Sequence, residues 1–159
     1  MPVSLLPNSE LTAIAYISSI AGLQCDVVAT QLPSDNTQWA KFGAIIVSVA
    51  GGVPDVYVPV AHPIVVLDFF ACNPGSNKPP WFKANALAEQ VRASVYDKGS
   101  VSRVVPITAG GVAYPYARVL TAFLLTEPRR KFGDTGDYAI YTCDLALSWH
   151  AMTTIPESY

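Results

Sequence analysis

The sequence has few charged residues, few histidines and no long uninterrupted apolar run. Only 14% of its residues are charged, against about 25% in ordinary soluble domains. Hydrophobic residues make up 51% of the chain. A protein of this composition either enters a membrane or covers apolar surface with other protein. The lengths of its apolar runs decide between the two.

The charge-free stretches are too short and too polar to cross a bilayer. The two longest, 11–25 and 104–117, are interrupted by hydroxyl-bearing residues, glycines or prolines. A membrane-spanning helix needs about 20 consecutive, predominantly apolar residues. No Lys or Arg precedes Glu10, so a secretory signal is not expected either. We therefore expect no membrane contact, and we expect the spare apolar surface to face other protein chains.

Residue types that usually carry chemistry are scarce and scattered. A net charge of −2 offers no basic footprint for nucleic-acid binding. Cys25, Cys72 and Cys143 indicate buried free thiols in a reducing compartment, with one disulfide and one free thiol as the alternative. The sequence contains no P-loop, no G-x-S-x-G, no H-E-x-x-H and no C-x-x-C motif. We expect no enzymatic activity, no cofactor and no metal.

Four residues are weak candidates for catalysis. His62 precedes a proline at an expected turn, and His150 follows the last expected strand, so both are interpreted as turn or surface residues. Cys143 lies on the apolar face of its strand, which favours a core thiol over a nucleophile. Asp68 interrupts the apolar run "IVVLDFF". It is either an acid with a shifted pKa or, as we favour, a structural or interface residue.

Hydrophobic periodicity predicts an α+β fold with a mainly antiparallel sheet. Two helices are expected, at 10–22 after a cap at Asn8 or Ser9, and at 81–96. Extended segments are expected at 26–31, 44–50, 56–61, 64–70, 103–107, 117–127 and 137–149. Helices and strands do not alternate one by one, so we expect both helices on one face of the sheet.

Glycine and proline mark the expected turns. "GGVPD" is expected to join 44–50 and 56–61 as a hairpin, and "TAGGVAYPY" is expected to break the strand that begins at 103. The pairs Gly51–Gly52 and Gly110–Gly111 lack the strand–loop–helix context of a phosphate cradle, so they are interpreted as turn glycines.

The longest expected strand runs through "DYAIYTCDLALSW". Every second residue from 139 to 149 is apolar, which is the period of a strand with one buried face. We expect the helices, chiefly 81–96, to cover that face. We also expect 117–149 to form one extended hairpin with a long basic tip.

The tip of this expected hairpin, "EPRRKFGDTGD", carries three adjacent cations. It is either a solvated loop or a contact that reaches a neighbouring subunit or a partner ring. The candidate contact residues are Arg129, Arg130, Lys131, Phe132 and Asp134.

These elements follow one another in an order found in a known protein family. An N-terminal helix precedes a hairpin, a strand ending in "VVLDFFA" and an alanine-rich helix, "FKANALAEQVRASVYD". Then come "VSRVVPITAGGVAYP" and a long strand after an Arg-containing loop, "RRKFGDTGDYAIYTCDLALSW". This order resembles the tail terminator, or tail completion, proteins of long-tailed bacteriophages. The segments "CNPGSNKPPW" and "TAGGVAYPY" are bulkier than the family pattern, and we expect them to be local contact loops.

The resemblance covers about residues 8–150 and implies a single domain over 1–159. It implies a structural virion protein that forms a ring, expected to be a hexamer, with itself, the tail tube protein and the head–tail connector protein as partners. The ring would cap the tail tube, end tube polymerisation and provide the surface for head joining, while DNA passes through the lumen without sequence-specific binding. Its expected place is the head-proximal end of the tail, and the host cytoplasm during assembly.

Two other interpretations stay open. One is a different ring of the same particle, such as a head–tail connector or stopper. The other is a small α+β enzyme or ligand-binding domain with a pocket between helix and sheet, in which Asp68, Cys143 and a histidine converge.

Overall fold

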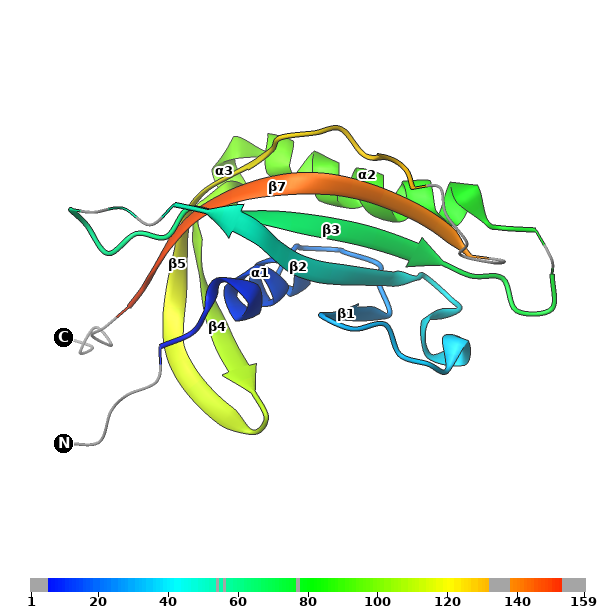
Figure 1. Cartoon of the computed structure of the whole chain (residues 1–159), viewed down its shortest axis with the longest axis horizontal. Helices are drawn as coiled ribbons and strands as arrows, with labels where there is room; N and C mark the ends of the chain where they lie inside the picture. Colours follow the sequence, from blue (N-terminus) through cyan, green and yellow to red (C-terminus); the bar gives the residue numbers. More distant parts are fainter. Residues whose placement is uncertain (1–5, 54, 56, 77, 132–137, 153–159) are drawn as a thin grey trace.

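The computed structural model describes residues 6–53, 55, 57–76, 78–131 and 138–152. They form an α+β fold in which a curled, mixed sheet carries its helices on one face (Figure 1). The predicted α+β class is confirmed. The helices are α1 (Ser9–Ser18), α2 (Trp81–Tyr96) and the short α3 (Lys98–Val101), with a 3-10 turn, η1 (Asn36–Trp39).

The strands of the described part of the chain form one sheet in the order β1-β2-β3-β7-β5-β4, with β6 beside β7. Their bounds are β1 (Val27–Ala29), β2 (Ala44–Gly52), β3 (Pro63–Ala71), β4 (Arg103–Ala109), β5 (Val112–Leu124), β6 (Arg129–Arg130) and β7 (Ala139–Ala151). Strand β1 pairs parallel with β2, whereas the other pairs are antiparallel, so the prediction of a mainly antiparallel sheet is confirmed in part.

The two main helices follow from local signals. The side chain of Asn8 accepts a hydrogen bond from the Leu11 amide at 2.8 Å and caps α1. Helix α1 ends at Ser18, earlier than predicted. Helix α2 has the predicted bounds, because its apolar residues at spacings of three and four all face the sheet. These buried residues are Ala84, Leu87, Ala88, Val91 and Val95. None of the helices in the described ranges is both long and apolar enough to cross a membrane.

Strand β7 is the centre of the sheet. It pairs with β3 through residues 139–146 and with β5 through residues 145–151. Its buried Leu145 and Leu147 belong to the same core cluster as residues of α1 and α2, so the prediction that the helices cover this face is confirmed. Burying each of these leucines stabilises the fold by about 1.5–3 kcal/mol. Trp149 Nε1 donates a hydrogen bond to Ser9 Oγ at 3.1 Å.

The predicted strand at 56–61 and its "GGVPD" hairpin are wrong. Strand β2 pairs directly with β3, with Ser48 opposite Val66. Among the described residues of this segment, 57–61, only Ala61 makes a bridge, opposite Trp149 in β7. The alternation of valines suggested a strand, but Pro59 has no backbone N–H to give to a ladder.

The predicted hairpin at 117–149 is confirmed in part. Strands β5 and β7 are antiparallel neighbours, with Val119 opposite Trp149. The three cations 129–131, which we call the basic segment, follow β5. They return to the sheet through β6, in which Arg129 lies opposite Thr142 and Arg130 opposite Tyr141. Since β7 also pairs with β3, this hairpin is embedded in the sheet.

A different hairpin projects from the sheet. The predicted break over "TAGGVAYPY" is confirmed only at Gly110 and Gly111, which form a tight turn with φ of +58° and +76° as the interpretation of turn glycines required. The rest of the segment is strand, because β4 ends at Ala109 and β5 begins at Val112. The pairing of β5 with β7 begins at Ala117, so residues 106–116 extend past β7. We call them the β4–β5 arm (Figure 1). The sheet curls so far that α1 contacts both β4 and β2.

Candidate interaction surfaces

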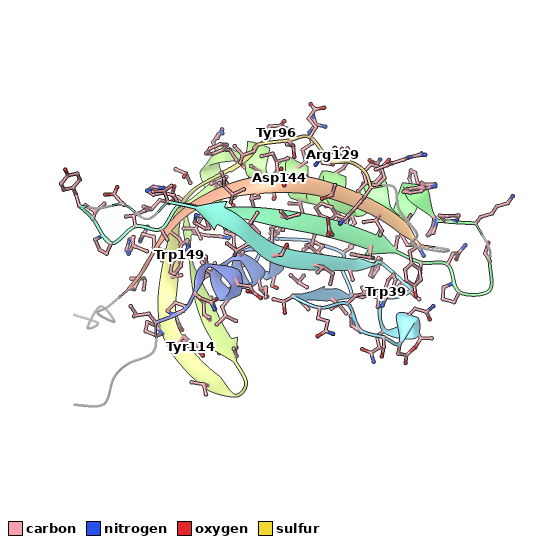
Figure 2. The ribbon with its side chains drawn as sticks, in the orientation of Figure 1. Trp39, Tyr96, Tyr114, Arg129, Asp144 and Trp149 are labelled. Atoms are coloured by element: carbon pink, nitrogen blue, oxygen red, sulfur yellow. The ribbon has the colours of Figure 1, made fainter. Side chains whose placement is uncertain are left out.

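The three cations of the basic segment point to two faces of the sheet. Side chains alternate along a strand, so Arg130 lies on the helix side, where its guanidinium carbon is 4.6 Å from the centre of the Trp81 ring. Lys131 Nζ lies 3.2 Å from Asp68 Oδ2. Arg129 Nη1 donates to Thr126 Oγ1 at 3.0 Å. Figure 2 shows Arg129 on the segment that runs along β7. The candidates Phe132 and Asp134 lie outside the described residues.

These contacts attach the basic segment to the rest of the fold while leaving its charges in contact with water. The Lys131 side chain is 51% exposed, whereas the Asp68 side chain is 17% exposed, so water screens this ion pair mainly on the lysine side. Asp68 Oδ1 is buried and has no hydrogen-bond partner in the described part of the chain. Asp68 therefore has a structural contact through one carboxylate oxygen.

Asp68 and Cys143 do not converge on one pocket. Asp68 lies on the sheet face away from the helices, whereas Cys143 is 1% exposed in the core between sheet and helices. Burial raises the pKa of the Cys143 thiol to about 12, and burial likewise raises the pKa of Cys25 to about 11. Both thiols are protonated at neutral pH, the state in which sulfur is a poor nucleophile. All three cysteines are free.

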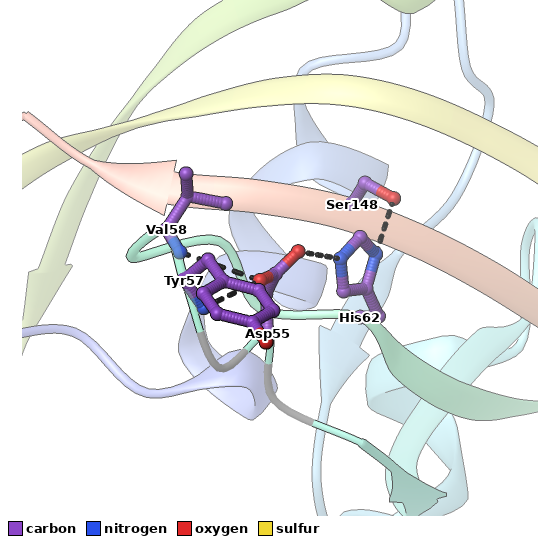
Figure 3. A network of polar contacts seen from close by, with 5 residues as sticks. All are labelled: Asp55, Tyr57, Val58, His62 and Ser148. Atoms are coloured by element: carbon purple, nitrogen blue, oxygen red, sulfur yellow. Dashed lines mark hydrogen bonds and ion pairs between the residues drawn. The ribbon is translucent and has the colours of Figure 1, made fainter.

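A polar network that was not predicted joins Asp55, His62 and Ser148 (Figure 3). His62 Nδ1 and Ser148 Oγ share a hydrogen bond at 2.9 Å. His62 Nε2 lies 3.9 Å from Asp55 Oδ2. The sequence held one usable signal: Ser148 is a polar residue on the face of β7 opposite the apolar one.

The network contains the residue types of a serine hydrolase triad but not its geometry. In such a triad the carboxylate accepts a hydrogen bond from the imidazole and fixes the orientation of the ring. Here the Asp55–His62 distance of 3.9 Å exceeds the roughly 2.7–3.2 Å of a hydrogen bond. Ser148 also lies within a strand, opposite Thr121 of β5. The arrangement is suited to fastening the β2–β3 connection to β7.

The fastened connection displays apolar side chains. Asp55 Oδ1 accepts hydrogen bonds from the amides of Tyr57 at 2.8 Å and Val58 at 3.3 Å. These bonds lower the pKa of the Asp55 carboxyl, so it is ionised at neutral pH. Tyr57 is nevertheless 94% exposed, and Val53 is 77% exposed. We call Val53, Asp55, Tyr57 and Val58 the finger.

The hydrogen bonds of Asp55 should keep the finger resistant to proteases. We expect an Asp55→Ala variant to be cut by chymotrypsin after Tyr57 several-fold faster than the wild type, because a protease needs locally opened backbone. Native-state digestion followed by mass spectrometry measures this rate. Asp35→Ala is the matched control, since it removes a similar turn acceptor, for the Thr37 amide, at η1. Equal cleavage of wild type and Asp55→Ala would mean that the carboxylate does not order the finger.

A groove lined by apolar and hydroxyl-bearing side chains lies between α1 and β4. This groove has a volume of about 330 Å³. It is lined by Leu11, Ile14, Ala15, Ser18, Ser19, Pro106, Ile107 and Thr108. None of these lining residues carries a charge. Further exposed apolar residues lie on β5 and at the start of α2, where Phe82 is 85% exposed.

The sequence matches no protein-family model and no curated protein. Within the described ranges, no group of three or more His, Cys, Asp or Glu side chains is placed to hold a metal ion. The resemblance to tail terminator proteins rests on the order of elements and stays a prediction.

Proposed function

We propose that this chain is the subunit of a ring that caps the tail tube of a long-tailed bacteriophage. The ring ends tube polymerisation and provides the surface to which the head is joined. Its mechanism is steric: one face of the ring copies the docking surface of a tube ring, and the other face does not, so addition stops. No catalytic step is part of this proposal.

The observation that carries the proposal is a pair of unlike apolar surfaces on one subunit. The finger exposes Tyr57 and Val53, whereas the groove between α1 and β4 is a concave apolar surface elsewhere on the fold. Head-to-tail contacts around a closed ring require two different, complementary surfaces on each subunit. The small number of charged residues supports the same proposal, because apolar flanks can then be covered by neighbouring copies.

The partners in this proposal are further copies of the chain, expected as a hexamer, the tail tube protein and the head–tail connector protein. DNA passes through the lumen without sequence-specific contacts. The ring lies at the head-proximal end of the tail and assembles in the host cytoplasm. The exposed cations Arg129 and Lys131 are proposed to contact a neighbouring ring.

Electron microscopy of phage particles made without this protein tests the function. We expect overlong tail tubes that are detached from filled heads, because tube polymerisation no longer has a stop. Normal-length tails beside unjoined or leaking heads would instead assign the chain to a connector or stopper ring. Intact infectious particles would overturn the proposal and favour an enzyme or ligand-binding domain. Restoring the gene in trans is the control.

A further inference from the structure

We propose that the finger of one subunit inserts Tyr57 into the groove between α1 and β4 of a second copy of this chain. This inference rests on the proposed ring and names the contact that closes it. The finger has a fixed conformation, the groove has a suitable size and lining, and the two lie apart on one subunit.

The finger is held in shape before any partner binds. Besides the two amide bonds to Asp55 Oδ1, its base is fixed by the two backbone hydrogen bonds between Ala61 and Trp149, at 2.8 and 3.0 Å. His62 adds its bond to Ser148. A preformed loop loses little conformational entropy on binding. An exposed tyrosine on such a loop has the features of an interface hot spot, because tyrosine adds large apolar area and one polar group.

The groove fits a tyrosine in size and polarity. Its volume of about 330 Å³ is at the lower end of the roughly 300–1,000 Å³ of small-ligand pockets, which suits one aromatic side chain with a neighbouring valine. Leu11, Ile14 and Ile107 provide apolar walls for the ring. The hydroxyl groups of Ser18 and Thr108 in the same lining can form hydrogen bonds with the tyrosine hydroxyl.

Other cavities of the described part of the chain fit the finger less well. The cavity beside α3 contains Asp97 and Arg103, and the one against β5 contains Lys98. A buried tyrosine would leave these charges poorly solvated. The cavity under Trp149 is lined by Pro59 and Ala61, which belong to the base of the finger. A tyrosine inserted there would lie next to the finger of the copy that receives it, whereas the groove between α1 and β4 has no finger residue in its lining.

The finger and the groove lie apart on the subunit. In Figure 1 the β2–β3 connection projects beyond the end of β2 at the left, whereas α1 lies beside β4, below β2. The finger therefore meets the groove of another copy, and the contact is head-to-tail. Pro106 occupies a register irregularity in β4, which is an edge strand. Because proline on an edge discourages strand pairing, the neighbour engages side chains in the groove and not the edge backbone.

Photo-crosslinking tests the contact on the full chain. A benzoylphenylalanine placed at Tyr57 is expected to crosslink to peptides 11–19 or 106–108 of a second copy, as identified by mass spectrometry. The same photoreactive residue at Phe82, which is also highly exposed, is the matched control and should not label the groove. Crosslinks from position 57 to any other part of a second copy would overturn the inference.

Self-association provides an independent measurement. Tyr57→Ser removes the inserted ring, and Ser18→Trp fills the groove from an exposed position without disturbing the core. Each is expected to weaken assembly about ten-fold or more in sedimentation velocity, as loss of an interface hot spot does, whereas Phe82→Ser should not. A ring that forms equally well with Tyr57→Ser would overturn this contact and leave the proposed function standing. A wild-type protein that stays monomeric at every concentration would also overturn this contact. Electron microscopy of particles made without the protein would then test the proposed function separately.

Discussion

A Gly43→Ala variant is expected to lose about 3 kcal/mol or more of unfolding free energy. Gly43 directly precedes β2 and has a φ of +103°. This conformation costs a residue with a Cβ about 1–3 kcal/mol. A Cβ at this position would also lie 2.5 Å from the carbonyl oxygen of Phe70 and 3.2 Å from Leu87 Cδ2. The first contact is with the backbone of the neighbouring strand, which cannot move aside without breaking the β2–β3 ladder.

Urea denaturation followed by circular dichroism measures this loss. Gly110→Ala is the matched control, because Gly110 also has positive φ, +58°, but a Cβ there meets nothing within 4 Å. We expect the control to lose only about 1–2 kcal/mol from backbone strain. If both variants lost the same unfolding free energy, the contact between the added Cβ and Phe70 O would contribute nothing. The backbone of Gly43 would then lie farther from Phe70 than the structure places it.

An Arg103→Met variant is expected to lose about 2–3 kcal/mol, since it removes hydrogen bonds of a charged group and keeps most of the apolar stem. The guanidinium donates to Tyr16 O and Ser100 O at 2.8 Å and to Ser19 Oγ at 2.9 Å. Its central carbon also lies 4.0 Å from the centre of the Tyr16 ring. One side chain thus ties the end of α1 to α3 and to the first residue of β4.

The charge alone should not replace this geometry. We expect Arg103→Lys to recover only part of the stability, because an ammonium group cannot reproduce three hydrogen bonds in a planar fork. Arg118→Met, on the exposed face of β5, is the matched control and should change the unfolding free energy by less than about 0.5 kcal/mol. Full recovery by lysine would show that Arg103 acts mainly through its charge.

Local patterns predicted those elements whose sequence repeats over several turns or pleats. The apolar residues of α2 recur over four turns, and β7 alternates over its length, so both were found with nearly correct bounds. The arm was missed because Gly110, Gly111 and Pro115 indicated a loop over 108–116, whereas the structure continues β5 through Pro115. The valines around Pro59 gave the opposite error, since their alternation looked like a strand.

The finger network could not be derived from the sequence. His62 and Ser148 are 86 positions apart, and they meet only because Ala61 lies opposite Trp149. That register depends on the order β3-β7-β5, which no local pattern encodes. The basic segment was found as a cluster, but its division between two faces follows from β6 pairing with β7.

The central position of β7 has a consequence for synthesis. Ribosomes make this strand after all the others in the sheet, yet β3 and β5 both pair with it. A nascent chain that has not reached residue 139 therefore holds the β2–β3 pair and the β4–β5 pair without β7, the strand that joins them. The edges of β3 and β5 that later pair with β7 are still open. Such chains depend on pairing between strands that are distant in sequence, which forms slowly. Meanwhile their unpaired strand edges can associate with other chains. Ala61 also pairs with Trp149, so the finger gains its fixed base only after β7 has emerged from the ribosome.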